Sequence, residues 1–121
     1  MIAERALHNF WSGFGLTAYD ENSVPDEAEM PYITYNVVTD CFDSEVIMSG
    51  SLWYRTISWA AITQKTDEIS RYLGLGGIML TFDDGGIWIK KSSPFAQRMR
   101  DESDDKIKRM VINISSEFIS E

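Results

Sequence analysis

Residues 46–73 read VIMSGSLWYRTISWAAITQKTDEISRYL, and the spacing of their apolar side chains changes partway along. The first half is rich in aromatic and β-branched residues, which suit a half-buried strand. In the second half, the side chains suited to burial recur at steps of three and four, the period of an amphipathic helix. These are Trp59, Ile62, Thr66, Ile69 and Leu73. Ser58 is placed to cap this helix and Gly74 to end it, so the stretch predicts a long strand that runs directly into a helix.

The alternation within the predicted strand leaves two interpretations open. Its apolar residues fall on both faces, with Val46, Met48, Leu52 and Tyr54 on one, and Ile47, Trp53 and Ile57 on the other. One interpretation is a β-bulge at Gly50 that shifts the phase. The other is a strand with apolar contacts on both faces, one towards the helix and one towards another subunit.

The rest of the chain supplies elements that can pack against this unit. A first helix is expected over residues 2–13 and an exposed acidic loop over residues 16–30. Further strands are expected over residues 31–38, 78–82, 87–91 and 107–119, with short hairpin connections at 39–45 and 83–86. The order helix, strand, strand, helix, strand, strand, strand predicts an α+β fold, in which a mixed or antiparallel sheet of about five strands has two helices packed on one face.

Length and charge restrict the class of protein. The 121 residues are the size of one domain, 1–121, and a chain of this size buries roughly two-thirds of its unfolded surface. Nineteen acidic residues against eleven basic ones give a net charge of −8, which argues against a general binder of nucleic acid or anionic membranes. The expected partners are therefore proteins.

The first residues and the cysteine content indicate where the chain is assembled. Glu4 and Arg5 stand where a signal peptide would have its apolar region, so we expect no signal peptide. No apolar run approaches the ~20 residues of a membrane span. A single cysteine, Cys41, excludes an internal disulfide and favours assembly inside a cell.

Catalytic and metal-binding patterns are not recognisable in this sequence, and we expect no enzyme, no cofactor and no metal. His8 is the only histidine, and the sequence has no second histidine or spare cysteine to complete a metal site, so His8 is expected at the boundary of the apolar stripe or at the surface. Asp83 and Asp84 are too few to hold a metal ion. The glycines of residues 74–77 follow a predicted helix, whereas phosphate-binding glycines precede one. The carboxylates of residues 16–30 are expected to be solvated, with a basic patch on a partner as the alternative contact.

Residues 92–105, SSPFAQRMRDESDD, are the segment that we expect to make contacts. We interpret them as an exposed loop that combines apolar side chains with arginine, a composition enriched in interfaces. The alternative is a solvated loop whose Phe95 packs into the core. Together with the outer face of the central strand, the predicted subunit or partner contacts are Trp53, Arg55, Ile57, Phe95, Arg98, Met99 and Arg100.

Three phrases of the sequence carry a resemblance to a known family. They are MPYITYNVVTD at residues 30–40, SLWYRTISW at 51–59 and GGIWIKKSSPFAQRMRD at 85–101. With the order of the elements, they resemble the tail terminator (tail completion, or minor tail) proteins of long-tailed bacteriophages, as found in prophages of Gram-positive bacteria. The resemblance spans nearly the whole chain and includes no catalytic signature.

The resemblance implies a structural virion protein. Such a protein forms a hexameric ring at the head-proximal end of the tail, stops polymerisation of the tail tube and provides the head-joining surface. The implied partners are further copies, the tail tube protein and a head-completion or neck protein, with no membrane. DNA would pass through the lumen without specific binding, which the net acidity suits. The implied location is the virion, after assembly in the host cytoplasm.

Two other functions stay open. One is a different virion protein, such as a head–tail connector, a neck protein or a tail tube subunit. The other, from a different class, is a small α+β ligand-binding or hydrolytic domain that uses Asp83, Asp84 or the acidic loop.

Overall fold

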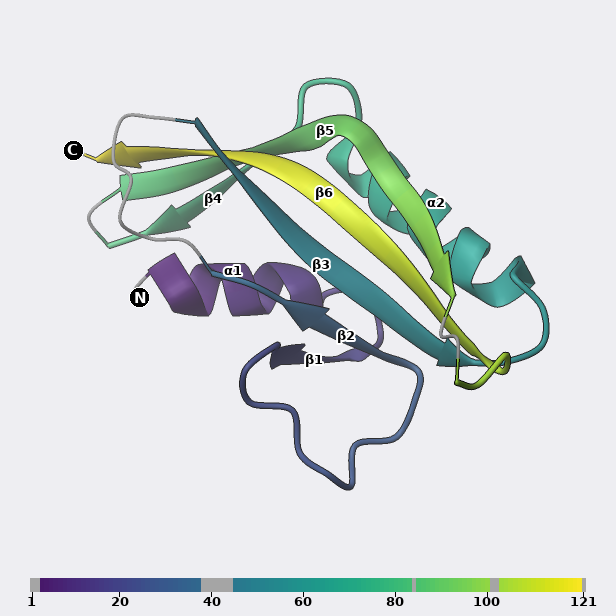
Figure 1. Ribbon diagram of the computed structural model, residues 1–121. Coiled ribbons are helices and arrows are strands. Elements are labelled where there is room, and N and C mark those ends of the chain that lie inside the picture. Colours follow the sequence, from purple (N-terminus) through teal and green to yellow (C-terminus); the bar gives the residue numbers. More distant parts are fainter. Residues whose placement is uncertain (1–2, 38–44, 84, 101–102, 121) are drawn as a thin grey trace.

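Six strands and two helices make up the fold of this chain, in a computed structural model that describes residues 3–37, 45–83, 85–100 and 103–120 (Figure 1). The elements are α1 (Ala3–Ser12), β1 (Thr17–Asp20), β2 (Tyr32–Tyr35), β3 (Glu45–Arg55), α2 (Ala60–Leu73), β4 (Ile78–Phe82), β5 (Gly85–Arg100) and β6 (Ile107–Ser120). The strands form one sheet in the order β1-β2-β3-β6-β5-β4. All neighbours are antiparallel except β1 and β2, which are parallel, so the predicted α+β class with a mixed sheet is confirmed.

The core lies between the two helices and one face of the sheet. Alternate residues of β3 and β6 are buried there, namely Met48, Leu52, Met110, Ile112, Ile114 and Phe118. The helices add Leu7, Phe10, Trp11, Phe14, Ile62, Ile69 and Leu73 to the same cluster. The ring of Tyr72 in α2 lies 6.3 Å from that of Phe10 and 5.5 Å from that of Phe14, centroid to centroid. Both helices therefore cover the same face, as predicted.

The predicted strand that runs into a helix is confirmed. Four side chains of the expected helix face are buried: Ile62, Thr66, Ile69 and Leu73. Gly74 ends α2 with a φ of 63°, a backbone conformation that favours glycine, and its N–H donates to the Ser70 carbonyl at 3.0 Å. The Ser58 hydroxyl accepts from the N–H of Ala60 at 3.1 Å. It stands one residue before the capping position, Trp59, but still satisfies an amide at the helix start.

Gly50 does not form a β-bulge, so that interpretation of the imperfect alternation is wrong. β3 pairs with β6 without interruption from Glu45 to Arg55. The reason for the glycine is steric, because a Cβ at this position would lie 2.7 Å from the ring of Trp11. Trp11 is only 1% exposed. The missing side chain of Gly50 therefore lets α1 pack its tryptophan directly onto the backbone of β3.

The sheet has six strands and not the five expected. Two segments that were expected to be loops are strands. β1 lies inside the segment expected to be an acidic loop, and its four residues are too few to show a clear alternation. Residues 92–100, expected to belong to an exposed loop, continue β5 as far as Arg100. The pairing register of β5 shifts between Lys91 and Ala96, around Pro94, and this shift removes the regular alternation that would have signalled a strand.

The remaining predicted elements are confirmed. The first helix, the strand after the acidic loop, the two strands around the Asp-Gly step and the long final strand all occur, with shorter or longer bounds. β2 and β3 are antiparallel, as the short connection between them predicts. That connection, with Cys41, lies outside the described residues, as does Asp84 in the β4–β5 turn.

The contact between Gly50 and Trp11 yields a test of the core. Gly50→Ala places a methyl group 2.7 Å from the Trp11 ring, so we expect a loss of about 1–3 kcal/mol in the free energy of unfolding, typical of overpacking. Urea denaturation measures it. Gly76→Ala is the control, because no heavy atom outside its chain neighbours lies within 4 Å of the added Cβ. Equal stability of the two variants would contradict this explanation of Gly50.

Candidate contact surface

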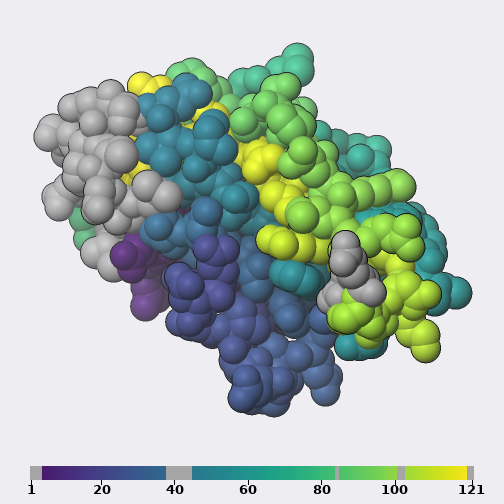
Figure 2. Space-filling model, viewed as in Figure 1, coloured from purple at the N-terminus to yellow at the C-terminus, as the bar shows by residue number. Residues whose placement is uncertain are grey.

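The sheet face opposite the helices, called the open face below, carries the candidate contact surface. Figure 2 shows β6 in yellow, exposed between β3 and β5, with no helix over it. The pairing register brings residues from five strands into one row across the sheet, and these are Thr17, Tyr32, Trp53, Arg109 and Met99. The row joins residues that are far apart in the sequence.

Aromatic rings and a guanidinium contact one another along this row. The ring centroids of Tyr32 and Trp53 are 6.5 Å apart, and the Arg109 guanidinium lies 4.8 Å from the Trp53 ring. Tyr19 of β1 packs edge-on against Tyr32, with centroids 5.6 Å apart. Tyrosine, tryptophan and arginine are the residue types most enriched among the strong contacts of protein interfaces.

Hydrogen bonds fix the orientation of the two largest side chains on the open face. Trp53 Nε1 donates to Thr34 Oγ1 at 2.8 Å, and Arg109 Nε donates to Ser51 Oγ at 3.0 Å. Thr34 and Ser51 are buried although no helix covers them, because Trp53 and Arg109 lie over them. Side chains that are already ordered lose less conformational entropy on binding, so this surface is preorganised for a contact.

Basic residues gather at the end of the sheet where β3 and β5 finish and β6 begins, called the charged end below. Six of the eleven basic residues lie there: Arg55, Arg98, Arg100, Lys106, Lys108 and Arg109. On the helix side, two cations lie near the Trp59 ring. The Arg98 guanidinium is 4.9 Å and Lys108 Nζ is 5.9 Å from the ring centroid. Arg55 pairs with Asp104, N to O, at 3.0 Å. Asp104 and Asp105 lie at the same end, in the connection between β5 and β6, so the described residues of the charged end carry both signs of charge with basic residues in excess.

The predicted contact residues in the strands lie on both faces of the sheet, some on the open face and some on the helix side. Trp53, Arg55 and Met99 belong to the open face, since they alternate along their strands with residues on the helix side. Met99 is 46% exposed. Arg98 and Arg100 lie on the helix side of β5, and the Arg98 guanidinium reaches Trp59 at the start of α2. The prediction that Arg98, Met99 and Arg100 belong to an exposed loop is therefore wrong, because these residues lie in β5. Their role as contacts stays a prediction.

Ile57 and Phe95 lie apart from both groups. Ile57 is 84% exposed in the connection between β3 and α2. Phe95 stands in the register shift of β5, partly buried against the core cluster, with Lys91 Nζ 6.0 Å from its ring centroid. Of the two predicted environments for Phe95, the structure supports packing on the core.

Three members of the open-face cluster were not predicted as contacts, namely Tyr19, Tyr32 and Arg109. Tyr19 belongs to a strand that the sequence does not signal. Tyr32 and Arg109 become neighbours of Trp53 only through the pairing register of β2, β3 and β6. The alternation of the final strand placed Arg109 on the outer face, and that signal alone could have identified it.

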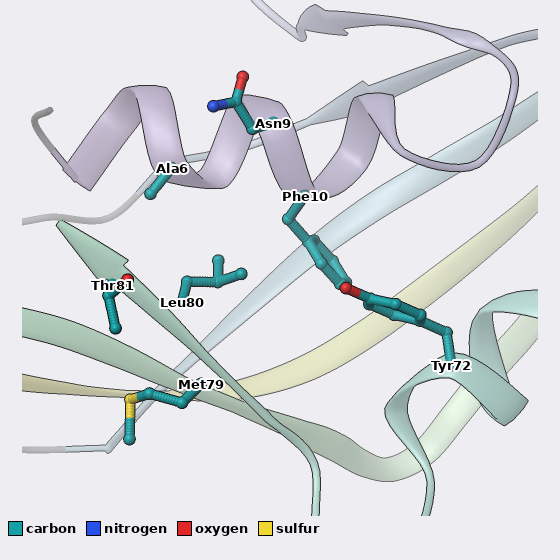
Figure 3. Close-up of a pocket in the computed structure, with 7 residues that line it drawn as sticks. All are labelled: Ala6, Asn9, Phe10, Tyr72, Met79, Leu80 and Thr81. Atoms are coloured by element: carbon teal, nitrogen blue, oxygen red, sulfur yellow. The ribbon is translucent and has the colours of Figure 1, made fainter.

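An open pocket of about 350 Å³ lies on the helix side, between α1, the end of α2 and β4 (Figure 3). Its lining is mainly apolar and consists of Ala6, Asn9, Phe10, Tyr72, Met79, Leu80 and Thr81. Figure 3 shows the rings of Phe10 and Tyr72 approaching each other at one end. No charged side chain lines it among the described residues, so it offers no pair of groups for acid and base catalysis.

His8 makes polar contacts on the exposed side of α1. Its Nδ1 lies 2.9 Å from the Tyr35 hydroxyl and its Nε2 lies 3.3 Å from the Ser12 hydroxyl. Burial, and then the charges of Asp20 and Glu4, raise the pKa of the Tyr35 phenol. The two contacts tie the exposed ring of His8 to β2 and to the last residue of α1.

The described part of the chain contains no group of three or more His, Cys, Asp and Glu side chains that could hold a metal ion. Cys41 and Asp84 fall outside this part. Neither described helix has the length and apolar character that crossing a membrane requires.

Comparisons with known proteins give a likeness in fold. No protein-family model matches this chain, and no curated protein matches it. Among solved structures, it is similar to a chain in the virion of a native gene transfer agent particle. The alignment covers 97% of this chain and 91% of that chain, with a TM-score of 0.58 and 15% sequence identity. At this identity, the likeness establishes a shared fold.

The position of Phe95 gives a test of the site assignment. Phe95→Ala removes a partly buried ring, so we expect a loss of about 1–3 kcal/mol in unfolding free energy, a fraction of the cost at a fully buried site. Met99→Ala, at an exposed position of the same strand, is the control and should change stability by less than about 0.5 kcal/mol. Urea denaturation compares them. A neutral Phe95→Ala would contradict the packing of this ring on the core.

Proposed function

We propose that this chain is a structural virion protein that forms a ring at the head-proximal end of a phage tail tube. There it stops polymerisation of the tube and provides the surface to which the head joins. The observation that carries this proposal is the shared fold with a chain of the gene transfer agent virion, which extends over nearly the whole of both chains. The phrases that resemble tail terminators support the particular position in the tail.

The location of those phrases in the fold adds support. Residues 30–40 include β2, residues 51–59 include the end of β3, and residues 85–101 include β5. β2 and β3 pair directly, and β5 joins them through β6. The phrases therefore share one sheet, and they supply Tyr32, Trp53 and Met99 to the row across its open face.

A protein that acts by assembly needs surfaces that are not buried within its own fold. The helices cover one face of the sheet, and the open face presents ordered aromatic and arginine side chains. Subunits that join head to tail into a closed ring use two different patches per copy. The open face and the charged end leave surfaces available to further copies, to the tube protein and to a neck protein, without disturbing the core.

Net charge supports passage of DNA through the ring. At −8, the chain repels phosphate on average, so DNA can cross a lumen lined by such subunits without specific binding. The partners of the proposed ring are further copies of the chain, the tail tube protein and a head-completion or neck protein. Its location is the head-proximal end of the tail in the virion.

Native mass spectrometry of the chain, alone and mixed with its tail tube protein, tests this function. We expect a closed oligomer of fixed stoichiometry, with six copies as the expected number from the resemblance. In electron micrographs, tube protein polymerised with the chain should give shorter tubes that carry a ring at one end. Tube protein polymerised alone is the control.

Two outcomes would overturn the proposal. A chain that stays monomeric even with the tube protein is not a ring-forming terminator. A chain that polymerises by itself into open-ended tubes is a tube subunit instead.

A further inference from the structure

β5 extends well beyond β4 and leaves part of its outer edge unpaired. β4 pairs with β5 only between Gly85 and Ile89. In the part of the chain that the structure describes, no strand pairs with the outer side of residues 96–100, called the free edge below. The side chains of its residues 97–100 are all exposed. An exposed edge presents backbone N–H and C=O groups that can pair with another chain.

The free edge is cationic. Arg98 and Arg100 extend from it, and Lys108 of β6 lies opposite Arg100 in the register. Among the described residues, neither arginine forms an ion pair, although the Arg98 guanidinium stacks on the Trp59 ring. An acidic segment of another chain would match the charge of this edge.

Two acidic segments of the chain reach this end of the sheet. One is the β5–β6 connection with Asp104 and Asp105, where Asp104 is already paired with Arg55 of the same subunit. The other comes from the opposite edge of the sheet. Residues 21–31 connect β1 to β2 and include no basic residue. From here on, the name acidic loop refers to these residues and no longer to the loop expected over residues 16–30. Their four carboxylates are all exposed, at Glu21, Asp26, Glu27 and Glu29. Glu29 lines a small surface hollow together with Arg55, which places the returning half of the loop at the charged end.

The sheet register places the acidic loop and the free edge on opposite sides of one subunit. The loop rejoins the sheet at Tyr32, which lies in the same row as Trp53, Arg109 and Met99. Going from Tyr32 to Met99 crosses β3 and β6 and spans three strand spacings, roughly 14 Å. The point where the loop rejoins the sheet and the free edge therefore lie on opposite sides of β3 and β6, and a head-to-tail contact joins two such different patches.

We propose that the acidic loop of one copy docks along the free edge of β5 in a second copy, with its carboxylates facing Arg98 and Arg100. This inference rests on the proposed ring-forming function and names the contact between its subunits. Charge complementarity selects a second copy as the occupant of the edge. Because the two patches differ, the contact repeats from copy to copy until the ring closes.

A charge exchange tests this contact. The variant R98E/R100E gives the free edge a negative charge, and D26K/E27K gives the loop a positive charge. Each variant alone brings like charges together, so we expect ring formation to require at least about tenfold higher protein concentration, as like-charge contacts across an interface cost several kcal/mol. An equal mixture should form rings again, with the two variants alternating, because every contact then joins opposite charges. Native mass spectrometry distinguishes the two masses in each ring.

Matched controls separate this contact from general charge effects. Arg71→Glu reverses an exposed charge on α2 and should leave ring formation unchanged. Rings of the unaltered chain should dissociate as NaCl is raised, because salt screens exposed charges.

The outcomes also separate this inference from the proposed function. If the unaltered chain assembles while both variants assemble equally well, or while their mixture fails to recover rings, the contact is wrong and the ring survives. If the unaltered chain stays monomeric with its tube protein, the ring itself is wrong.

Discussion

The packing of Trp11 on the bare backbone of Gly50 is the contact on which the rest of this structure depends. It holds α1 against the sheet face that α2 also covers, so that the apolar residues of both helices and of β3 and β6 form one cluster. The opposite face then has no covering layer. Its large side chains, Trp53 and Arg109, pack on each other and on small hydroxyl residues, and they remain available to a partner.

Much of the fold follows from local patterns in the sequence. The change of period within residues 46–73 predicts both β3 and α2, and the alternation of residues 107–119 predicts β6. β1 is missed because four residues give no pattern, and the second half of β5 is missed because its register shifts near Pro94. The role of Gly50 cannot be read from its neighbours in sequence, because the side chain that requires it belongs to α1.

The candidate contact surface was predictable in composition but not in arrangement. The sequence predicts Trp53, Met99 and the arginines of residues 92–105 as contact residues, and it shows that residues 21–31 are acidic. Which of them lie together depends on the strand order β1-β2-β3-β6-β5-β4, which is a property of the whole chain. The segment with Arg98 and Arg100, expected to be a loop, is the end of β5 and has a free edge. The acidic loop connects β1 to β2, at the opposite edge of the sheet.

Hydrogen–deuterium exchange, compared between monomer and assembled ring, tests most directly whether assembly uses the free edge and the acidic loop. The account predicts slower exchange on assembly for the amides of residues 96–100 and 21–31, with little change in α1 and α2, whose buried faces are already occupied in the monomer. Slower exchange confined to the helices, with no change in these two segments, would contradict it.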